Sequence, residues 1–256
     1  MPSLQIVELL PGFQTFSDDN VNNTYHGSVA AECGGIFSAY FKSVPVQEVF
    51  IECLCSLIAQ DLELPTPEPL LIIPAEDACP EEHHPEIPLF GSIDDGHPSL
   101  RKRIKQGYDT DELNKRLLRW RYLPRASVFD EQMLNGDRHA GNLLYTGINE
   151  FELIDHGLAF SGESDQPCSE NKLLELINNS DTVSKRRAVK SIRGKDLCAI
   201  GKIDAAALVK KTLFEAYNVP KAFTDHLMQV YQERLNFLEY FVLERLGLPT
   251  EPSLFP

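Results

Sequence analysis

The spacing of apolar residues in the first third of the chain predicts a set of β-strands. Residues 4–10 and 24–31 are rich in strand formers, and residues 36–42 alternate with a period of two behind Gly34 and Gly35, which is typical of a hairpin. The polar segment 17–23 is rich in Asp and Asn. It predicts a loop between the first two strands, where backbone N–H groups can face an anion.

One helix interrupts these strands. From Val46 to Leu62 apolar residues recur at spacings of three and four, which predicts a helix. The prolines in segment 64–69 end it, because proline cannot continue a helix. The apolar run 70–74 then predicts a buried strand, and the Pro-, His- and Glu-rich segment 75–88 predicts a loop.

Beyond about Phe90 the pattern changes to amphipathic helices. These are predicted in segments 111–123, 170–177, 204–217 and 223–246. The sequence therefore predicts an α+β fold of two lobes, with a small β-rich N-lobe at residues 1–90 and a larger helical C-lobe at residues 91–256. Ligand sites prefer the cleft between such lobes.

Composition limits the classes of function. The chain of 256 residues has 43% hydrophobic and 24% charged residues, and no apolar run approaches the length that crosses a bilayer. The first residues lack the basic region of a secretory signal, so we expect a soluble, cytoplasmic protein without a membrane partner. A formal net charge of −14 argues against direct binding to nucleic acid.

Three basic runs and a pair of histidines are interpreted as solvent-facing rather than as sites. The basic runs are 101–105, 115–125 and 184–195, and such runs are usually solvated helix faces. His83 and His84 are adjacent in the predicted loop 75–88. Adjacent residues rarely form a metal site without further ligands, so we expect them to lie in an exposed loop.

Segment 129–160 contains the residues with the clearest chemistry. Asp137 lies five residues before Asn142, and two short apolar runs separated by a turn at 146–150 lead to Asp155. Two strands flanking that turn would bring the three polar side chains together. Phosphoryl transfer uses such a set, in which one carboxylate orients the acceptor hydroxyl while an amide and a second carboxylate hold Mg²⁺. A polar hairpin whose Asp, Asn and Gly residues only make turns remains the alternative.

The same segment resembles a known family. NGDRHAGNLL (135–144) followed by LIDHG (153–157) resembles the DRHxxN and IDxG signature of the phosphoinositide-kinase-like branch of the protein-kinase-like superfamily, and equally that of HipA-like bacterial kinases. Residues 34–42 resemble the strand that carries the ATP-binding lysine. Residues 48–69 resemble a helix of the HipA-like family and the sequence after it, which favours that family.

The resemblance covers roughly residues 20–160 and implies a two-lobed kinase-like fold with roles for named residues. Lys42 would contact the phosphates of ATP, and Glu52 would pair with Lys42, with Glu48 as a rival. Asp137 would be the catalytic base. Asn142 and Asp155 would bind the metal, and Arg138 and His139 would brace the loop or neutralise charge. Because the chain has no GxGxxG loop, contact with the phosphates would come from the segment near Thr24.

The implied activity is ATP- and Mg²⁺-dependent transfer of phosphate to a hydroxyl, with a protein serine or threonine as the expected acceptor and an antitoxin-type protein as a further partner. Two alternatives stay open. One is a lipid or small-molecule kinase of the phosphoinositide-kinase-like branch. The other is a pseudokinase that uses the fold as a scaffold. A scaffold needs none of four residues that the chain retains together, which argues against this alternative: Lys42, Asp137, Asn142 and Asp155.

Overall fold

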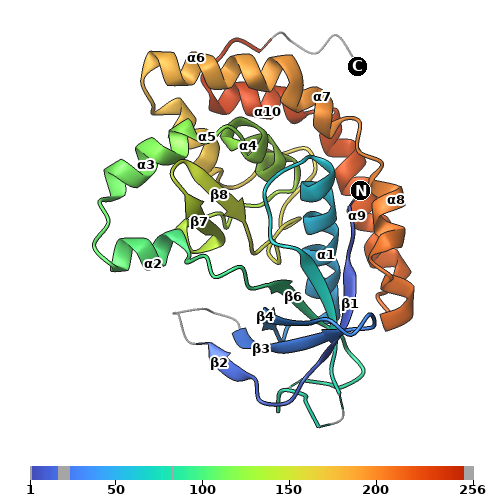
Figure 1. Ribbon diagram of the computed structural model, residues 1–256. Helices are drawn as coiled ribbons and strands as arrows, with labels where there is room; N and C mark the ends of the chain where they lie inside the picture. The colour runs from blue at the N-terminus through green and yellow to red at the C-terminus, as the bar shows by residue number, and fades with distance from the viewer. Residues whose placement is uncertain (1, 17–23, 76, 82, 251–256) are drawn as a thin grey trace. The chain divides into compact units, whose positions relative to one another are not determined.

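The computed structural model describes residues 2–16, 24–75, 77–81 and 83–250. It has a mixed α+β composition, with a strand-rich N-terminal part and a helical C-terminal part, as the hydrophobic pattern predicts (Figure 1). The chain packs into two compact units. Unit 1 comprises Met1–His97, Ile154–Gly157 and Asp204–Asp225, and unit 2 comprises Pro98–Leu153, Leu158–Ile203 and His226–Pro256. The lobe boundary at residue 90 stays a prediction.

Unit 1 is built on a six-stranded sheet of order β1-β5-β6-β4-β3-β2, in which β1 also pairs with β3. Strands β1 and β5 are parallel and the other pairs are antiparallel. The strands are β1 (Gln5–Leu9), β2 (Gln14–Phe16), β3 (Thr24–Ala31), β4 (Ile36–Lys42), β5 (Pro69–Ile73) and β6 (Leu89–Ile93). The short strand β2 was not predicted, because three residues are too few to show alternation. The predicted loop 17–23 lies outside the described residues.

The side chains that alternate along these strands form one apolar core. Its buried members include Leu9, Val29, Phe41 and Leu70. Gly91 in β6 allows the close packing, because a Cβ at this position would lie 2.6 Å from the Cδ1 of Ile72 and 2.8 Å from the carbonyl oxygen of Tyr40. The core fixes β4, and therefore the position of its last residue, Lys42.

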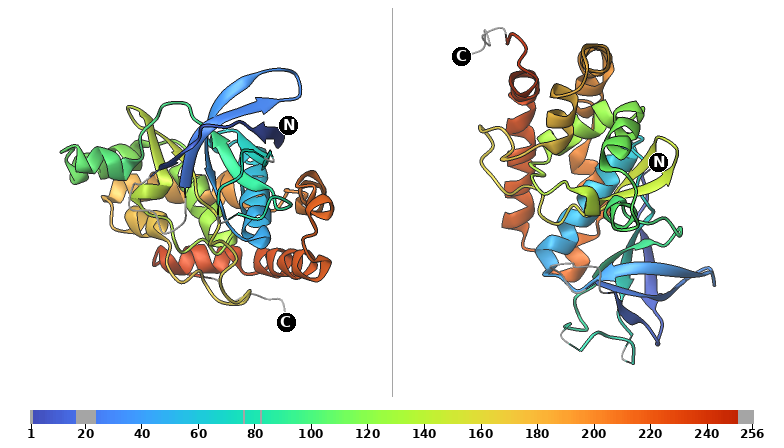
Figure 2. Two further views of the ribbon diagram at one scale, coloured as in Figure 1. Left: turned by 90° about the horizontal axis from the view of Figure 1, so that it is seen from below. Right: turned by 90° about the vertical axis from the view of Figure 1, so that its left-hand side faces the viewer.

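Helix α1 (Val46–Asp61) is buried on all sides, unlike a surface helix with one apolar face. It packs against β5 and β6 on the sheet and against α8 (Ala205–Lys211), as Figures 1 and 2 show. Phe50 of α1 makes edge contacts with Phe214 and Phe223. A charged residue on this helix is therefore enclosed, which matters for Glu52.

Unit 2 is mainly helical and centres on α4, which packs against α3, α5, α6 and α10. Its elements are α2 (Leu100–Lys105), α3 (Thr110–Arg119), α4 (Leu123–Gln132), the 3₁₀ turn η1 (Ala140–Asn142), β7 (Leu143–Gly147), β8 (Glu150–Leu153), α5 (Lys172–Asn178), α6 (Thr182–Ser191), the π-helical turn η2 (Ile192–Asp196), α7 (Leu197–Ile200) and α10 (Leu238–Arg245). Strands β7 and β8 form the predicted hairpin.

Two of the predicted helices are each divided in two. Segment 204–217 breaks between α8 and the 3₁₀ turn η3 (Phe214–Tyr217), because Leu213 has a left-handed φ of 58°. Segment 223–246 breaks between α9 (Lys221–Leu235), which contributes to both units, and α10. Apolar periodicity continues across both breaks, so the pattern alone predicts a single helix.

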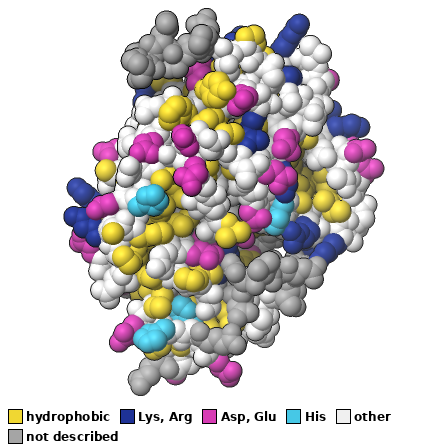
Figure 3. Space-filling view, turned by 180° about the vertical axis from the view of Figure 1, so that it is seen from behind, with side chains coloured by type: hydrophobic (Ala, Val, Ile, Leu, Met, Phe, Trp, Pro, Cys, Tyr) yellow, Lys and Arg dark blue, Asp and Glu magenta, His cyan; other side chains and the backbone are white. Residues whose placement is uncertain are grey.

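Charged side chains of both signs lie on one face of the molecule (Figure 3). On the face shown in Figure 3, acidic side chains are distributed over the described part, and Lys and Arg lie mostly towards its margins. No helix within the described ranges is long and apolar enough to span a membrane.

Candidate active site

Unit 1 places Lys42 between two carboxylates. The Lys42 Nζ lies 2.8 Å from the Oε1 of Glu52 and 2.6 Å from the Oδ1 of Asp155. The Glu52 side chain is 0% exposed and that of Lys42 is 15% exposed, whereas that of Asp155 is 37% exposed. The cluster is therefore closed on the Glu52 side and open to solvent at Asp155.

Burial and pairing act in opposite directions on this cluster. Burial alone lowers the pKa of Lys42, but the charges of Glu52 and Asp155 and their hydrogen bonds outweigh burial and raise it above its ordinary value. Lys42 is therefore a permanent cation. Complete burial raises the pKa of Glu52, and the charge of Lys42 and the hydrogen bond from the His156 amide offset this only in part.

The segment 154–157 is held against α1 by backbone contacts. The His156 N–H donates to the Oε2 of Glu52 at 2.8 Å, so both oxygens of Glu52 are engaged. Asp155 has a left-handed φ of 62°, a conformation that few residues other than glycine adopt. Such backbone strain persists where surrounding contacts enforce it and is frequent at functional sites.

Gly157 serves close packing. A Cβ at Gly157 would lie 2.5 Å from the Oε1 of Glu48, so a larger residue here requires the flexible Glu48 side chain to move. The turn after the acidic residue uses the left-handed φ of Asp155 itself. Glu48 therefore faces Gly157, and Glu52 is the acid of α1 whose oxygen receives the Lys42 hydrogen bond.

Thr24 lies directly opposite Lys42 in the sheet. The two residues are partners in the antiparallel β3–β4 pair, and Thr24 is buried. Asn22 and Asn23, with which we expect Thr24 to contact phosphate, fall outside the described residues. The structure thus brings Thr24 to the end of the strand that carries the lysine.

Unit 2 contains the loop from Asn135 to Asn142, which is fixed by a buried ion pair. The Arg138 Nε and Nη2 donate to the two oxygens of Asp130 at 3.0 and 2.9 Å, and its Nη1 donates to the Asn142 carbonyl at 2.9 Å. Asn135 also donates to Asp130. Arg138 and Asp130 are 2% and 0% exposed. Arg138 therefore braces the loop from within.

Asp137 and Asn142 meet in the same loop. The Asn142 Nδ2 donates to the backbone carbonyl of Asp137 at 2.9 Å and lies 3.3 Å from its Oδ2. The amide nitrogen of Asn142 is thereby turned towards the protein, while Asp137 is half-buried. A half-exposed carboxylate on a fixed backbone suits a general base, which must reach an outside hydroxyl.

His139 contacts the turn that follows it and the side chain of Arg101. Its Nδ1 accepts a hydrogen bond from the Gly141 N–H at the start of η1, and its Nε2 lies 3.0 Å from the Nη2 of Arg101. Arginine and a backbone N–H can only donate, so both contacts need a ring nitrogen of His139 that accepts. A neutral imidazole has just one such nitrogen. The two contacts therefore compete, and both orient the ring.

Two residues that position the loop were not identified from the sequence. Arg101 comes from a basic run interpreted as a solvated face, and nothing local marks it. Asp130 and Glu131 do leave a signal, because they are adjacent acids within the apolar stretch 126–134, and charges are almost never fully buried unless they are paired.

The expectation that His83 lies in an exposed loop is wrong. His83 is buried, with its Nδ1 2.9 Å from the Ser43 Oγ and its Nε2 2.7 Å from the Ile87 carbonyl. Burial lowers the pKa of His83, which favours the neutral ring, and its contact with Ser43 ties the loop around His83 to the end of β4. His84 is exposed, as expected.

The donor atoms present fit Mg²⁺ in type. Asn142 and Asp155 offer an amide oxygen and a partly exposed carboxylate, the hard ligands that Mg²⁺ prefers. Among the described residues, no cluster of three or more His, Cys, Asp or Glu side chains could hold a metal by itself. Mg²⁺ in phosphotransferases is bound through one or two carboxylates together with substrate phosphates, so such a cluster is not required.

No known family model matches the chain, and no curated protein is significantly similar to it.

Proposed function

We propose that the chain is an ATP- and Mg²⁺-dependent phosphotransferase, similar to HipA-like kinases, that moves the γ-phosphate of ATP to a serine or threonine hydroxyl on a protein. The observation that carries this proposal is the contact of Lys42 with two carboxylates, one enclosed on a helix and one open to solvent. A lysine on a strand paired with a glutamate on the following helix, together with a metal-binding aspartate, is the set that protein kinases use.

The charge balance of the cluster also supports the proposal. Two carboxylates face one ammonium, and the exposed carboxylate is the one in the strained conformation. An additional negative group that remains open to solvent is suited to attract a further cation.

The proposed mechanism assigns each residue a separate task. Lys42, oriented by Glu52, binds the phosphates and holds them by charge. Asn142 and Asp155 would hold Mg²⁺, which when bound neutralises phosphate charge. Asp137 orients the acceptor hydroxyl and takes its proton. Arg138 keeps the Asp137 backbone in place through Asp130, so it positions the base without touching the reactants.

Transfer of label from γ-labelled ATP tests the proposal. We expect the purified protein to label protein serine or threonine in a cell lysate, with a need for Mg²⁺, and Asp137→Asn to abolish labelling. Asp111→Asn, at an exposed position of α3, is the matched control and should keep it. Label in the lipid or small-molecule fraction would favour a kinase of the phosphoinositide-kinase-like branch. If no fraction supported ATP consumption, the chain would be interpreted as a pseudokinase scaffold.

A further inference from the structure

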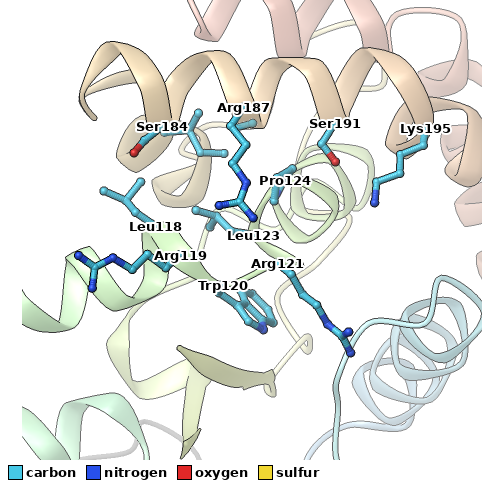
Figure 4. Close-up of a pocket in the computed structure, with 12 residues that line it drawn as sticks. Leu118, Arg119, Trp120, Arg121, Leu123, Pro124, Ser184, Arg187, Ser191 and Lys195 are labelled. Carbon is cyan, nitrogen blue, oxygen red and sulfur yellow. The ribbon is translucent and has the colours of Figure 1, made fainter. Parts of the chain in front are cut away.

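Two of the basic runs line one pocket in unit 2. Residues 118–124, at the turn from α3 to α4, form one side, and α6 with its π-helical continuation η2 forms the other (Figure 4). The cavity has a volume of about 180 Å³. The sequence alone separates these two runs by about sixty residues, so their meeting could not be predicted from charge pattern.

The residues of α6 and η2 that line this pocket are mostly polar, with Ala188 among them. Ser184, Arg187, Ser191 and Lys195 recur at spacings of three and four, which places them on one side of the helix. Arg187 and Lys195 are exposed, whereas Ala188 is the buried residue of α6, so the charged ends of this face reach solvent beside the cavity. The pattern therefore favours a solvated or ligand-filled space over a packed interface.

The cations of this face have no acidic partner. In Figure 4 the side chains of Arg187 and Lys195 extend from α6 and η2 towards α4, with Ser191 between them in the chain. Among the described residues, neither Arg187 nor Lys195 forms an ion pair. The neighbouring acid Asp196 is buried and already engaged, because it pairs with Arg125 at 3.2 Å and accepts from Ser191 at 2.7 Å.

The helix is irregular at this point. Residues Ile192–Asp196 form a π-helical turn that contains Lys195, and Gly194 within it faces open space. π-helical turns inside α-helices are rare and are frequently found at functional sites. This irregularity is independent of the charge pattern and lies on the same wall of the pocket.

We propose that this pocket binds a small organic phosphate monoester. Arginine presents a planar fork that matches phosphate oxygens, and lysine adds a second charge. The lining also includes Leu123 and Ile177, whose apolar side chains suit a compact apolar body on the ligand. A cavity of about 150 Å³ is enough for one benzene ring, so a volume of about 180 Å³ suits a compact monoester.

The single tryptophan of the chain gives the test a local signal, because Trp120 lines the pocket. Phenyl phosphate is titrated while fluorescence is excited selectively at tryptophan. We expect phenyl phosphate to bind saturably. Inorganic phosphate and phenol should each bind at least about tenfold more weakly, because each lacks one half of the ligand. A tenfold ratio of dissociation constants corresponds to a difference of about 1.4 kcal/mol in binding free energy. Added salt should weaken binding.

Matched variants on the same helix make the test specific. Arg187→Gln combined with Lys195→Gln should weaken phenyl phosphate binding at least about tenfold. Arg186→Gln combined with Lys190→Gln removes the same charge from exposed positions outside the pocket and should change it less than about twofold. Equal losses in both pairs, or no saturation in the wild type, would overturn the proposal. Tighter binding of a phosphoserine peptide than of phenyl phosphate would overturn the ligand class.

Discussion

The two units each contain a buried ion pair, and the pairs differ in how completely they are enclosed. Arg138 and Asp130 in unit 2 are 2% and 0% exposed, and the guanidinium donates to both oxygens of Asp130 and to the Asn142 carbonyl. Lys42 and Glu52 in unit 1 share their cluster with Asp155, which is 37% exposed. A closed pair fixes the backbone around it. A cluster with an open member can also exchange a protein partner for a ligand.

This difference predicts the largest effect on folding at Arg138. Arg138→Met leaves Asp130 as an uncompensated charge in the interior, so we expect the free energy of unfolding to fall by about 3–5 kcal/mol. The measurement is the urea denaturation midpoint. As a control, Lys172→Met breaks the Lys172–Glu170 pair, whose side chains are 43% and 47% exposed, and should cost less than about 1 kcal/mol. Similar losses in the two variants would remove the distinction between closed and exposed pairs.

The open cluster should be sensitive in activity rather than in folding. Lys42→Met removes the cation that holds the phosphates, and we expect the transfer rate to fall by about 10²-fold or more. Its loss of stability should be smaller than that of Arg138→Met, because Glu52 can take up a proton. Lys221→Met, at an exposed position, serves as the control. A Lys42→Met protein with full activity would exclude the proposed nucleotide site.

A smaller effect, on pH dependence, sharpens the comparison further. Burial raises the pKa of Glu52, and Lys42 is the main charge that lowers it. In Lys42→Met the pKa of Glu52 should therefore be higher in the folded state than its ordinary value of about 4.3, which applies to the unfolded chain. The stability that the protonated acid contributes should be fully present below that ordinary value. It should be lost as the pH rises through the raised pKa of the folded state. Denaturation midpoints between about pH 4 and 8 should fall in this variant.

The double variant Lys42→Met/Glu52→Gln supplies the control for that slope. Glutamine cannot titrate, so its denaturation midpoints should lose the fall that Lys42→Met shows. If the two proteins had the same pH profile, Glu52 would not be the titrating group.

How much the sequence predicted differs between local and long-range features. Strands β3 and β4 and helix α1 agree with prediction, because alternation and helical spacing are local properties. The same rule predicted α9 and α10 as one helix, because apolar periodicity continues across the short break between them. Long-range contacts could not be predicted. Nothing in the basic runs indicates that Arg187 shares a pocket with Leu123 or that Arg101 contacts His139.

The candidate site shows the same difference between local and long-range features. The chain order of Lys42, Glu52 and Asp155 suggested a cluster only through resemblance to a family, and the contacts of Lys42 follow from how β4 and α1 pack. The choice between Glu52 and Glu48 depended on helix orientation, which composition does not give. The acid Asp130 within an apolar stretch indicates a buried pair, but its partner Arg138 is identified only by the fold.

Mg²⁺-dependent binding of a non-hydrolysable ATP analogue to two aspartate variants tests the central claim most directly. Asp155→Asn replaces the proposed metal carboxylate, so calorimetry should show that the gain in affinity from Mg²⁺ is lost. Asp137→Asn should keep affinity near that of the wild type, while its transfer rate falls by about 10²- to 10⁴-fold. Loss of metal-dependent binding in Asp137→Asn but not in Asp155→Asn would reverse the two roles, and no change in binding or rate in either variant would contradict the proposed kinase activity.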